Sequence, residues 1–559
     1  MSSSVTGPAP DPTPAVLPVH RVGTRNLLVD LPDLPTAMTW HAALTAAPLP
    51  GQTEVGAAAR TVLVRFASAT DAEAARGVLP HFVPPDAKTT APRDVTVEVH
   101  YDGADLESLA TSLAMSPDAL VDWHTSTTWA AAFGGFAPGF TYCVPADPAH
   151  ALDVPRHDSP RAAVPDGAVA LAGDFSAVYP RTSPGGWQLL GTTSRTFWDA
   201  DAEHPALLSP GDRVHYRQVS ERIEVGTPDA EVSSDVAAGS ASSGASDTTR
   251  HAASQPAHHP VLRLDDPGLQ VLIEDAGRPG AGDLGVTTSG AADRASAQAA
   301  NDALGNRRSA AVLENIGGLA LTALVETVVV VTGAVAPVDV NGRTAERGVP
   351  LLLRPGATLT VGEAEHGLRS YVGVRGGVIA DTVLGSSSTD LLSGLGPSPL
   401  ASGDTIHAGE PTGSVRPVSP GIRTDGVLRV VPGPRDDWFA DGVDALTGRT
   451  WTVTAMSNRV GLRLTGEEAI VREQSGELAS EGMVAGSVQV PPNGEPVVFL
   501  RDHAVTGGYP VIATVIPEDL DAAAQLPPGS DVTFTIHTGD ATSAASTGDA
   551  TSTDTQEAP

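Results

Sequence analysis

Residues 457 to 509 contain the densest group of polar side chains that could do chemistry. Charged and amide residues occur there among strand-forming residues, an unusual pattern for a plain core. Such groups line a pocket or form loop rims, and we favour the pocket. Asp502 and His503 are neighbours, so on a strand they would face opposite sides and could not share a Ser-His-Asp relay. The polar residues include Asn458, Arg459, Arg463, Ser480, Glu481, Gln489, Asn493, Asp502, His503, Thr506 and Tyr509.

A second candidate is the segment Phe133–Phe140, which is both aromatic and glycine-rich. Glycine lets a backbone approach a ligand closely, and aromatic rings supply a flat wall. A tight turn that fills the core would use the same residue types, so both interpretations stay open. The nearby Cys143 has no histidine partner close in sequence, which predicts a buried apolar residue and not a nucleophile.

Arginines accompany several loops and could bind carboxylate or phosphate groups through forked hydrogen bonds. Arg156 and Arg161 flank a Ser-Pro pair, and Arg278 follows two acids and a glycine. Surface ion pairing is the competing explanation for each arginine in so acidic a chain. The hydroxyl cluster Ser386–Asp390, which includes Ser387, could bind phosphate or form a turn.

A predicted helix over residues 291–304 offers another anion-binding position, because free N–H groups at a helix start favour negative charge. Ser289 and Asp293 lie near this start, and Gly305 is a typical C-terminal stop. Glu314 is an isolated acid, predicted to be solvated or to accept structural hydrogen bonds.

Charge and composition exclude several classes of partner. A formal net charge of -32 argues against nucleic acid and anionic membranes, which need a cationic face. Lys88 is the only lysine and follows no glycine-rich loop, so a Walker-type phosphate site is excluded. One cysteine excludes an intramolecular disulfide. The start shows no secretory pattern and residues 319–338 are predicted as buried strands, so a cytoplasmic protein is expected.

The elements that must position these residues are mainly short strands, because 58 glycines and 47 prolines favour many turns. Two bodies are expected, at about 20–225 and 260–538. They are joined by a flexible segment rich in Ser, Ala, Asp and Gly. The first body begins with mixed helices and strands. Helices are predicted over 37–46, 70–78 (with Thr70 as N-cap), 105–114 and 117–127, and strands over 27–31, 61–66 and 95–101.

The two bodies contain related pieces in the same order. The segment Gly167–Leu171 is echoed by Gly486–Val490, and a Gly-Gly-aromatic triplet follows each, at Gly185–Trp187 and Gly507–Tyr509. Each body then ends in a Pro-Gly turn and an alternating strand. Chance recurrence in a glycine-rich β protein is the alternative, but the matched order favours a duplication. A duplication implies two barrels of one fold, with a site in or between them.

Many of these motifs together resemble the B and C subunits of prokaryotic 5-oxoprolinase. The same modules resemble the carboxyltransferase region of urea carboxylase (formerly the two allophanate hydrolase subunits) and a sporulation-kinase inhibitor with its antagonist. The B-like motifs are Phe133–Phe140, Pro160–Pro165 and Ser183–Trp187. The C-like motifs are Asp275–Gly280, Ser289–Asp293, Ser457–Arg463, Ser480–Met483 and Thr506–Pro510.

The resemblance implies a mainly β fold with a small α+β part, in which two cyclophilin-like β-barrel modules stand in tandem and an α+β domain precedes the first. The expected organisation is a disordered N-terminus (1–18), an α+β domain (19–95), a barrel (96–226), a flexible linker (227–259), a β module like the C subunit (260–538) and a disordered tail (539–559).

The resemblance also implies ATP-dependent opening of 5-oxoproline to glutamate, with ATP and Mg²⁺ as cofactors and a separate A subunit as partner. The protein would hold phosphates and the substrate carboxylate with cations placed where charge develops. The residues proposed for substrate or phosphate binding are Arg161, Arg278, Ser387, Asn458, Arg459, Arg463, Gln489, Thr506 and Tyr509. The proposed catalytic acids, acting on water or a metal, are Asp293, Glu481 and Asp502, and no separate protein metal site is predicted.

Two other functions stay open. One is a carboxyltransferase-type enzyme acting on a small amide with a biotin carrier from another chain. The other is a non-enzymatic regulator of a histidine kinase, although fusing inhibitor and antagonist makes such a switch less natural. A homo-oligomer is compatible with any of these functions.

Overall fold

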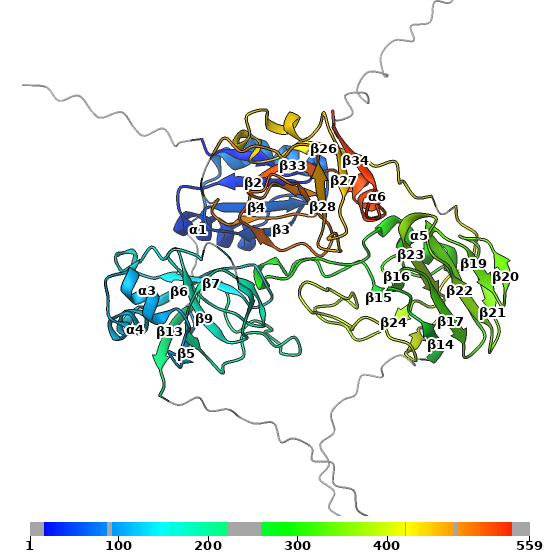
Figure 1. The fold of residues 1–559 in the computed structure, drawn as a ribbon, viewed down its shortest axis with the longest axis horizontal. Coiled ribbons are helices and arrows are strands. Elements are labelled where there is room, and N and C mark those ends of the chain that lie inside the picture. Colours follow the sequence, from blue (N-terminus) through cyan, green and yellow to red (C-terminus); the bar gives the residue numbers. More distant parts are fainter. Residues whose placement is uncertain are drawn as a thin grey trace, which may run out of the picture.

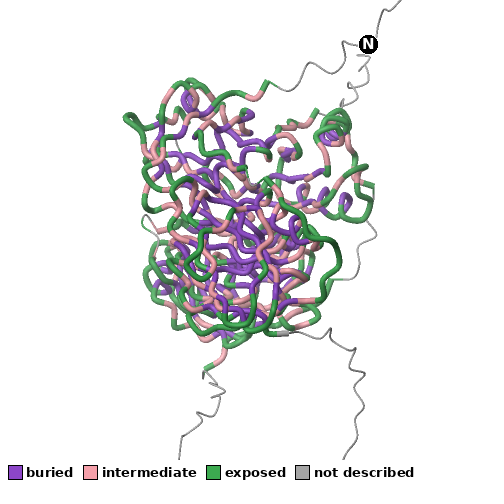
Figure 2. The backbone as a smooth tube through the Cα atoms, turned by 90° about the vertical axis from the view of Figure 1, so that its right-hand side faces the viewer, coloured by how far each residue is buried: buried purple, intermediate pink, exposed green. Residues whose placement is uncertain are grey.

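The computed structural model describes residues 16–85, 92–157, 159, 161–220, 259–419, 421–474, 476 and 478–538. These residues form three lobes (Figure 1). Buried residues fill the lobes, and exposed residues cover the outside (Figure 2). The expectations for residues 1–15, for Lys88, for the joining segment up to residue 258 and for the tail from residue 539 concern parts outside the described residues.

The N-terminal α+β domain is an antiparallel sheet in the order β1-β2-β4-β3, against which helix α1 packs. Asp33 caps α1 by accepting the N–H of Thr36. Ser68 caps the second helix through the N–H of Asp71, so the predicted N-cap at Thr70 is wrong. The elements are β1 (Val19–Arg21), β2 (Asn26–Asp30), α1 (Leu34–Ala46), β3 (Gln52–Ala57), β4 (Thr61–Phe66), α2 (Ala69–Val78) and η1 (Leu79–His81).

The first barrel follows, with seven strands in the order β12-β9-β10-β7-β6-β13-β5. Ser116 caps α4 by accepting the N–H of Ala119, and Pro117 occupies its first turn. The elements are β5 (Asp94–Val99), α3 (Leu106–Ser112), α4 (Pro117–Ser126), β6 (Trp129–Gly134), β7 (Thr141–Pro145), η2 (Pro148–His150), β8 (Arg161–Val164), β9 (Ala168–Ala172), β10 (Phe175–Val178), β11 (Ser183–Gly185), β12 (Gln188–Thr192) and β13 (Arg213–Gln218).

The chain from β14 to β25 forms a lobe of its own, the two-sheet lobe. Its two sheets enclose a shared apolar core, and helix α5 packs on one of them. Asp293 caps α5, and Gly305 ends it with a φ of 64°, as expected for a left-handed stop. The elements are β14 (His259–Asp266), β15 (Gln270–Glu274), η3 (Gly282–Leu284), α5 (Arg294–Leu304), β16 (Val312–Ile316), β17 (Leu319–Ala323), β18 (Thr327–Val335), β19 (Val338–Val340), β20 (Arg343–Ala345), β21 (Leu351–Leu353), β22 (Thr358–Val361), β23 (His366–Val374), β24 (Val378–Ile379) and β25 (Thr405–Ala408).

The last part of the chain forms a closed barrel around a second large core. The predicted C-like module therefore contains a two-sheet lobe and a separate barrel. The elements are β26 (Val427–Pro432), η4 (Asp436–Trp438), η5 (Gly442–Ala445), β27 (Thr450–Val453), β28 (Gly461–Gly466), β29 (Glu481–Gly482), β30 (Ser487–Gln489), β31 (Val497–Phe499), β32 (Thr506–Gly507), β33 (Val511–Val515), η6 (Pro517–Asp519), α6 (Leu520–Ala524) and β34 (Asp531–Ile536).

The two barrels share one topology. The order β12-β9-β10-β7-β6-β13-β5 corresponds strand for strand to β33-β30-β31-β28-β27-β34-β26 in the closed barrel. In each barrel, the strand that comes first along the chain pairs in parallel with the strand that comes last, β5 with β13 and β26 with β34. β26 also pairs with β33, whereas the first barrel is closed by one bridge between His100 and Thr192. This agreement supports the predicted duplication, and the expected mainly β fold is confirmed.

The α+β domain packs against the closed barrel of the other half of the chain, so that blue and orange elements form one lobe in Figure 1. Arg435 of the closed barrel donates to Asp30 at 2.6 Å and to Glu481 at 2.8 Å. Burial alone would raise the pKa of Asp30, but hydrogen bonds from His20 and Arg435 lower it below its usual range. An apolar cluster beside these ion pairs joins Leu28 and Leu63 to Val484.

Candidate functional site

A cavity of about 500 Å³ lies between the two barrels. Equivalent pieces of the duplicated fold form its opposite walls, because the triplet Gly185–Trp187 of one barrel and the triplet Gly507–Tyr509 of the other both line it. Tyr179 after β10 and Phe499 in β31 are also related by position and line the same cavity. The other lining residues used below are Phe136, Phe140, Tyr142, Arg156, His157, Arg472, Ser480, Gln489 and Thr506.

One wall of this inter-barrel pocket is aromatic. The ring of Phe140 lies 5.1 Å from Tyr142 and 5.4 Å from Trp187, in edge-to-face contacts. A Cβ on Gly135 would lie 2.6 Å from the Oγ1 atom of Thr506, so this glycine lets the loop approach the other barrel closely. Phe133 and Phe140 both belong to the core, as the turn interpretation expects, and Phe140 also lines the pocket. The role of this segment as a ligand wall stays a prediction.

The described lining of the pocket contains two arginines and one histidine, Arg156, Arg472 and His157. None of the lining residues that the structure describes is an Asp or Glu, although the chain carries a net charge of -32. Arg156 is exposed and forms no hydrogen bond or ion pair with the described part of the chain. Such a lining attracts small anions and would repel cations.

His157 and Arg472 are held in place by neighbours. The Nε2 atom of His157 is 3.2 Å from a carboxylate oxygen of Asp105. Arg472 donates to the carbonyl of Val490, and its guanidinium lies 5.7 Å from the ring centre of Tyr509. Both groups are thus oriented by the protein before any ligand arrives.

Neutral hydrogen-bonding groups complete the pocket. Burial raises the pKa of Tyr179 to about 12, so its phenol stays protonated and able to donate. Burial also raises the pKa of Tyr142, against the lowering effect of Arg156 and of hydrogen bonds with Ser480 and Thr506. Gln489 donates to the carbonyl of Tyr509 at 3.0 Å. These groups offer hydrogen bonds to a polar, uncharged part of a ligand.

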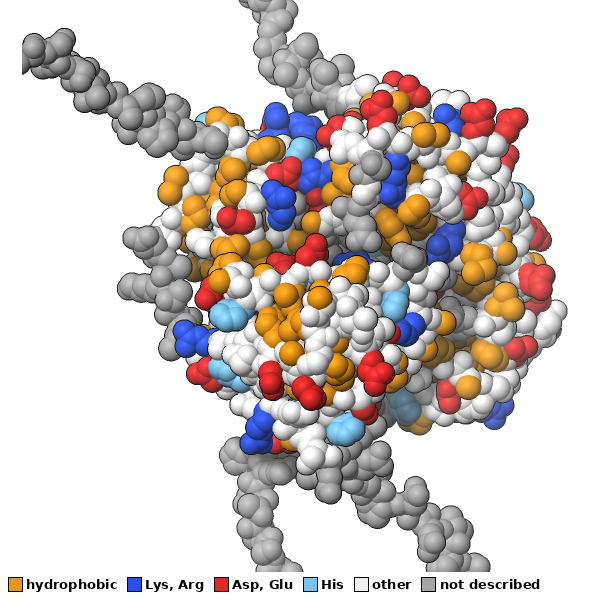
Figure 3. All heavy atoms as spheres, turned by 60° about the vertical axis from the view of Figure 1, so that its left-hand side comes forward, with side chains coloured by type: hydrophobic (Ala, Val, Ile, Leu, Met, Phe, Trp, Pro, Cys, Tyr) orange, Lys and Arg blue, Asp and Glu red, His pale blue; other side chains and the backbone are white. Residues whose placement is uncertain are grey.

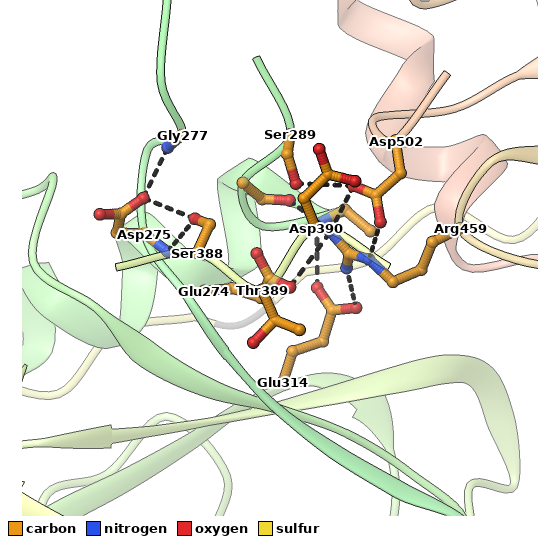
Figure 4. Close-up of polar contacts among 12 residues, drawn as sticks. Glu274, Asp275, Gly277, Ser289, Glu314, Ser388, Thr389, Asp390, Arg459 and Asp502 are labelled. Carbon is orange, nitrogen blue, oxygen red and sulfur yellow. Dashed lines mark hydrogen bonds and ion pairs between the residues drawn. The ribbon is translucent and has the colours of Figure 1, made fainter. Parts of the chain in front are cut away.

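A second polar cluster lies at the boundary between the two-sheet lobe and the closed barrel (Figure 4). Arg459 donates from Nε to Asp502 at 2.9 Å, from Nη1 to Glu314 and from Nη2 to the Gly290 carbonyl at 2.7 Å. Glu274 is 3.3 Å away. All these side chains are almost completely buried, so the guanidinium is closed to a ligand from solvent.

The carboxyl groups around Arg459 differ in ionisation. Burial would raise the pKa of Glu314, but the charges of Arg459 and Arg369 lower it, so this group is ionised. Burial raises the pKa of Glu274 well above its ordinary value, and the nearby Glu314 and Asp502 charges add to the effect. The charge of Arg459 opposes this rise. The Arg459 cluster is a compensated structural network that joins two lobes.

Three of the predicted site residues, Gln489, Thr506 and Tyr509, line the inter-barrel pocket. Arg161 lies behind the pocket and donates to Asp105 at 2.6 Å, the same carboxylate that contacts His157. These residues are brought together as a group from both barrels.

The other predicted residues lie elsewhere. Arg459 and Asp502 belong to the Arg459 cluster, and Arg463 is on the surface. The remaining ones serve local structure: Arg278 donates to the Ser388 carbonyl, Ser387 donates its N–H to Asp275, Asp293 caps α5, Asn458 holds a turn and Glu481 pairs with Arg435.

Sequence reasoning missed His157 and Arg472 as pocket residues. His157 directly follows Arg156, which stands near a Ser-Pro pair. Arg472 lies in the polar stretch 457–509 but next to no motif. The internal repeat was the usable signal, because both residues precede the related segments that begin at Gly167 and Gly486.

Two buried groups that resemble catalytic residues lie outside any cavity described above. His124 contacts the Tyr101 hydroxyl at 2.7 Å and the Ser176 hydroxyl at 3.0 Å inside the first barrel. Burial lowers its pKa to about 3, so the ring is neutral and inaccessible. Burial raises the pKa of Cys143 to about 12, consistent with the predicted unreactive core residue.

Metal and membrane features are limited in the described ranges. No group of three or more His, Cys, Asp or Glu residues there could hold a metal ion. No helix in those ranges is long and apolar enough to cross a membrane. On the face shown in Figure 3, acidic and basic side chains are interspersed.

Comparison with known proteins agrees with this two-part architecture. The model for carboxyltransferase subdomains C and D matches residues 17–208, and the model for subdomains A and B matches residues 284–536. The crystal structure of TTHA0988 is 32% identical, with a TM-score of 0.76, and covers 91% of this chain and 100% of that chain.

Named relatives match the two halves separately. The C subunit of 5-oxoprolinase from Escherichia coli is 33% identical over 285 residues, which is 49% of this chain and 90% of that protein. The B subunit from the same species is 39% identical over 127 residues, 22% of this chain and 57% of that protein. Urea amidolyase of Saccharomyces cerevisiae is 29% identical over 303 residues, 49% of this chain and 16% of that protein.

The chain therefore belongs to the carboxyltransferase-domain family. Within that family it joins in one polypeptide the counterparts of the B and C subunits of 5-oxoprolinase, which confirms the predicted resemblance.

Proposed function

We propose that this chain acts in the ATP-dependent hydrolysis of 5-oxoproline to glutamate, as fused B and C subunits that work with a separate A subunit. The names of its relatives support the reaction class. The observation that carries the proposal is the inter-barrel pocket, where Arg156, His157 and Arg472 face a cavity whose described lining residues include no Asp or Glu.

The pocket suits the shape and charge of 5-oxoproline, a flat lactam ring bearing a carboxylate. Arg156 and Arg472 would bind the carboxylate, and the ring would lie on Phe140 and Trp187. Tyr142 would donate a hydrogen bond toward the lactam carbonyl, and the side-chain oxygen of Gln489 would accept one from the lactam N–H. A cavity of about 500 Å³ is large enough for a molecule of this size with additional reacting groups.

A lactam carbonyl is a poor electrophile, and ATP supplies a phosphoryl group that makes its oxygen a leaving group. Transfer of the phosphoryl group leaves ADP, and water then adds to the activated carbon. The ring opens as the C–N bond breaks and the nitrogen takes up a proton, which gives γ-glutamyl phosphate. A second water molecule displaces the phosphate and releases glutamate. The arginines and the glycine backbones at Gly185–Gly186 and Gly507–Gly508 fit phosphate oxygens. Mg²⁺ would be held by the phosphates and water, because the described residues offer no carboxylate cluster for it.

The test combines the purified chain with the separate A subunit, ATP, Mg²⁺ and 5-oxoproline, and measures glutamate and phosphate together. We expect equal amounts of both products, and little of either when the chain or the A subunit is omitted. Absence of glutamate from the complete mixture would contradict the proposed reaction.

A pair of variants links that reaction to the pocket. Arg156→Gln should raise KM for 5-oxoproline about 10- to 100-fold, the loss expected for one charge-assisted hydrogen bond. Arg195→Gln changes an exposed arginine of the same barrel outside the pocket and should leave KM unchanged. If the two variants had the same KM for 5-oxoproline, the pocket would not be its binding site.

Carboxyl transfer is the second candidate function, favoured by the carboxyltransferase family models and by the urea amidolyase match. The same cationic pocket would then receive the carboxylate of carboxybiotin on a carrier from another chain. Incubating the chain with free carboxybiotin and a small amide, and measuring carboxylated amide, tests it. A product in this assay without ATP would favour transfer over hydrolysis.

A further inference from the structure

A second cavity, of about 580 Å³, lies between the α+β domain and the closed barrel. It shares no lining residue with the inter-barrel pocket. One wall comes from β1, β2 and α2, and the other from β26 and η4. The cavity therefore exists only because the two halves of the chain dock on each other.

The wall from the α+β domain carries Arg21 and Glu73, which pair with each other. Arg76, outside the cavity lining, pairs with the same carboxylate at 2.7 Å. Two guanidinium groups thus share one carboxylate. Because these side chains are about half exposed, their ion pairs are weak and Arg21 can exchange its partner for a ligand.

The wall from the barrel carries the carboxylate of Asp436, at the start of η4. It forms no ion pair and no hydrogen bond with another side chain in the part of the chain that the structure describes. Burial and the neighbouring Asp437 raise its pKa, against the lowering effect of backbone N–H groups and of His20. A positive group beside Asp436 would offset both the cost of burying its carboxylate and the repulsion from Asp437.

Histidines and apolar residues fill the space between the charged walls. His20 contacts Asp30 at 2.9 Å and is held by it, and His537 lines the cavity near the end of β34. Leu27, Ala72 and Val431 give the cavity an apolar part. The site therefore offers positive, negative and apolar surfaces within a single small volume.

We propose that this cavity binds a free α-amino acid as its zwitterion, with the carboxylate at Arg21 and the ammonium group at Asp436. A simple anion would meet the carboxylate of Asp436, and a simple cation would meet the excess arginine charge. Only a ligand with both charges satisfies the two walls together. The inference does not depend on the reaction in the other pocket.

The experiment measures binding to the full chain without any catalytic assay. The individual proteinogenic L-amino acids are screened by thermal shift, and binding of each hit is quantified by calorimetry. At least one amino acid should bind. The corresponding carboxylic acid, in which a hydrogen replaces the ammonium group, should bind at least about tenfold more weakly than that amino acid.

Two variants locate the ligand. Asp436→Asn should weaken binding about tenfold or more, whereas Asp437→Asn, a neighbouring exposed carboxylate outside the cavity lining, should not. Arg21→Gln gives a second test on the opposite wall. The proposal is overturned if no amino acid binds, if the corresponding carboxylic acid binds as tightly, or if folded Asp436→Asn and Arg21→Gln both bind like the unmodified chain.

Discussion

Arg459 and Arg472 belong to the same polar stretch of the closed barrel, yet their guanidinium groups have different surroundings. Arg459 is buried and uses its donors on Asp502, Glu314 and a backbone carbonyl. Arg472 makes one backbone hydrogen bond and lies against Tyr509 at the edge of a cavity. The first arginine joins two lobes, and the second can meet a ligand.

The difference shows that residue type and local sequence density do not reveal which charge is available for function. What decides is the number of neighbouring acceptors that the fold brings to each guanidinium. In the Arg459 cluster those acceptors come from the two-sheet lobe as well as from the barrel. In the inter-barrel pocket the facing wall comes from the first barrel and supplies aromatic rings and glycines instead.

The largest expected effect is from removing the charge of Arg459. Arg459→Gln leaves buried carboxylates without compensation and should lower the free energy of unfolding by roughly 3–5 kcal/mol. Urea denaturation measures this change in the free energy of unfolding. Arg463→Gln, an exposed arginine in the same barrel, serves as the control and should match the unmodified chain. A folded Arg459→Gln with unchanged stability would mean that the cluster is not structural.

The next effect separates the two arginines by activity. Arg472→Gln should raise KM for the anionic substrate about tenfold or more. It should cost only about 1 kcal/mol of stability, because it removes one backbone hydrogen bond and one cation–π contact. Steady-state kinetics and denaturation on the same protein measure both. A large loss of stability with unchanged KM would mean that Arg472, like Arg459, has a structural role and does not bind the substrate.

An intermediate effect concerns Asp30, whose carboxylate joins the α+β domain to the closed barrel. Its folded pKa lies below the ordinary value of 3.8, so the unfolded chain takes up the proton first as the pH falls. The stability that Asp30 contributes is therefore fully present above about pH 5 and decreases below about pH 4.

Asp30→Asn should lower stability by about 2 kcal/mol at pH 7, the scale of charge-assisted hydrogen bonds. The difference from the unmodified chain should narrow as the pH falls from 5 to about 3. Thermal melts across this range measure it. A difference that stays constant, or that grows as the pH falls, would contradict the assigned role of the Asp30–Arg435 pair.

The smallest expected effect is at Asn458, the neighbour of Arg459. Its side-chain oxygen accepts from the N–H of Val460 at 2.9 Å and from Gly461 at 3.3 Å, in an exposed turn. Asn458→Ala should cost at most about 1 kcal/mol and leave KM unchanged. A strong activity loss without destabilisation would instead make Asn458 a ligand-binding residue.

Much of the secondary structure followed from local patterns. The strand over residues 61–66 and the helices starting at Pro117 and ending before Gly305 match, because caps, prolines and alternating apolar residues act locally. The N-cap at Thr70 failed because Ser68, two residues earlier, also has a hydroxyl and accepts the N–H of Asp71. Choosing between such neighbours depends on how the chain enters the helix.

The candidate site was less predictable. Gln489, Thr506 and Tyr509 were found because glycine-aromatic motifs surround them, and they do line the pocket. Arg278 and Arg459 were chosen because arginine suits anions, but the fold surrounds them with protein acceptors. A hydrogen-bonding partner distant in sequence leaves no local signal.

The amino-acid sequence by itself determined the short strands, the helix ends, the repeated motifs and the net negative charge. Those properties depend on residues near one another in the chain and on the sum of charges. The tertiary structure decided that the two barrels face each other across a cationic cavity and that the α+β domain docks on the opposite half. Such contacts join residues hundreds of positions apart, so only the packed chain reveals which charges are compensated and which remain open to a ligand.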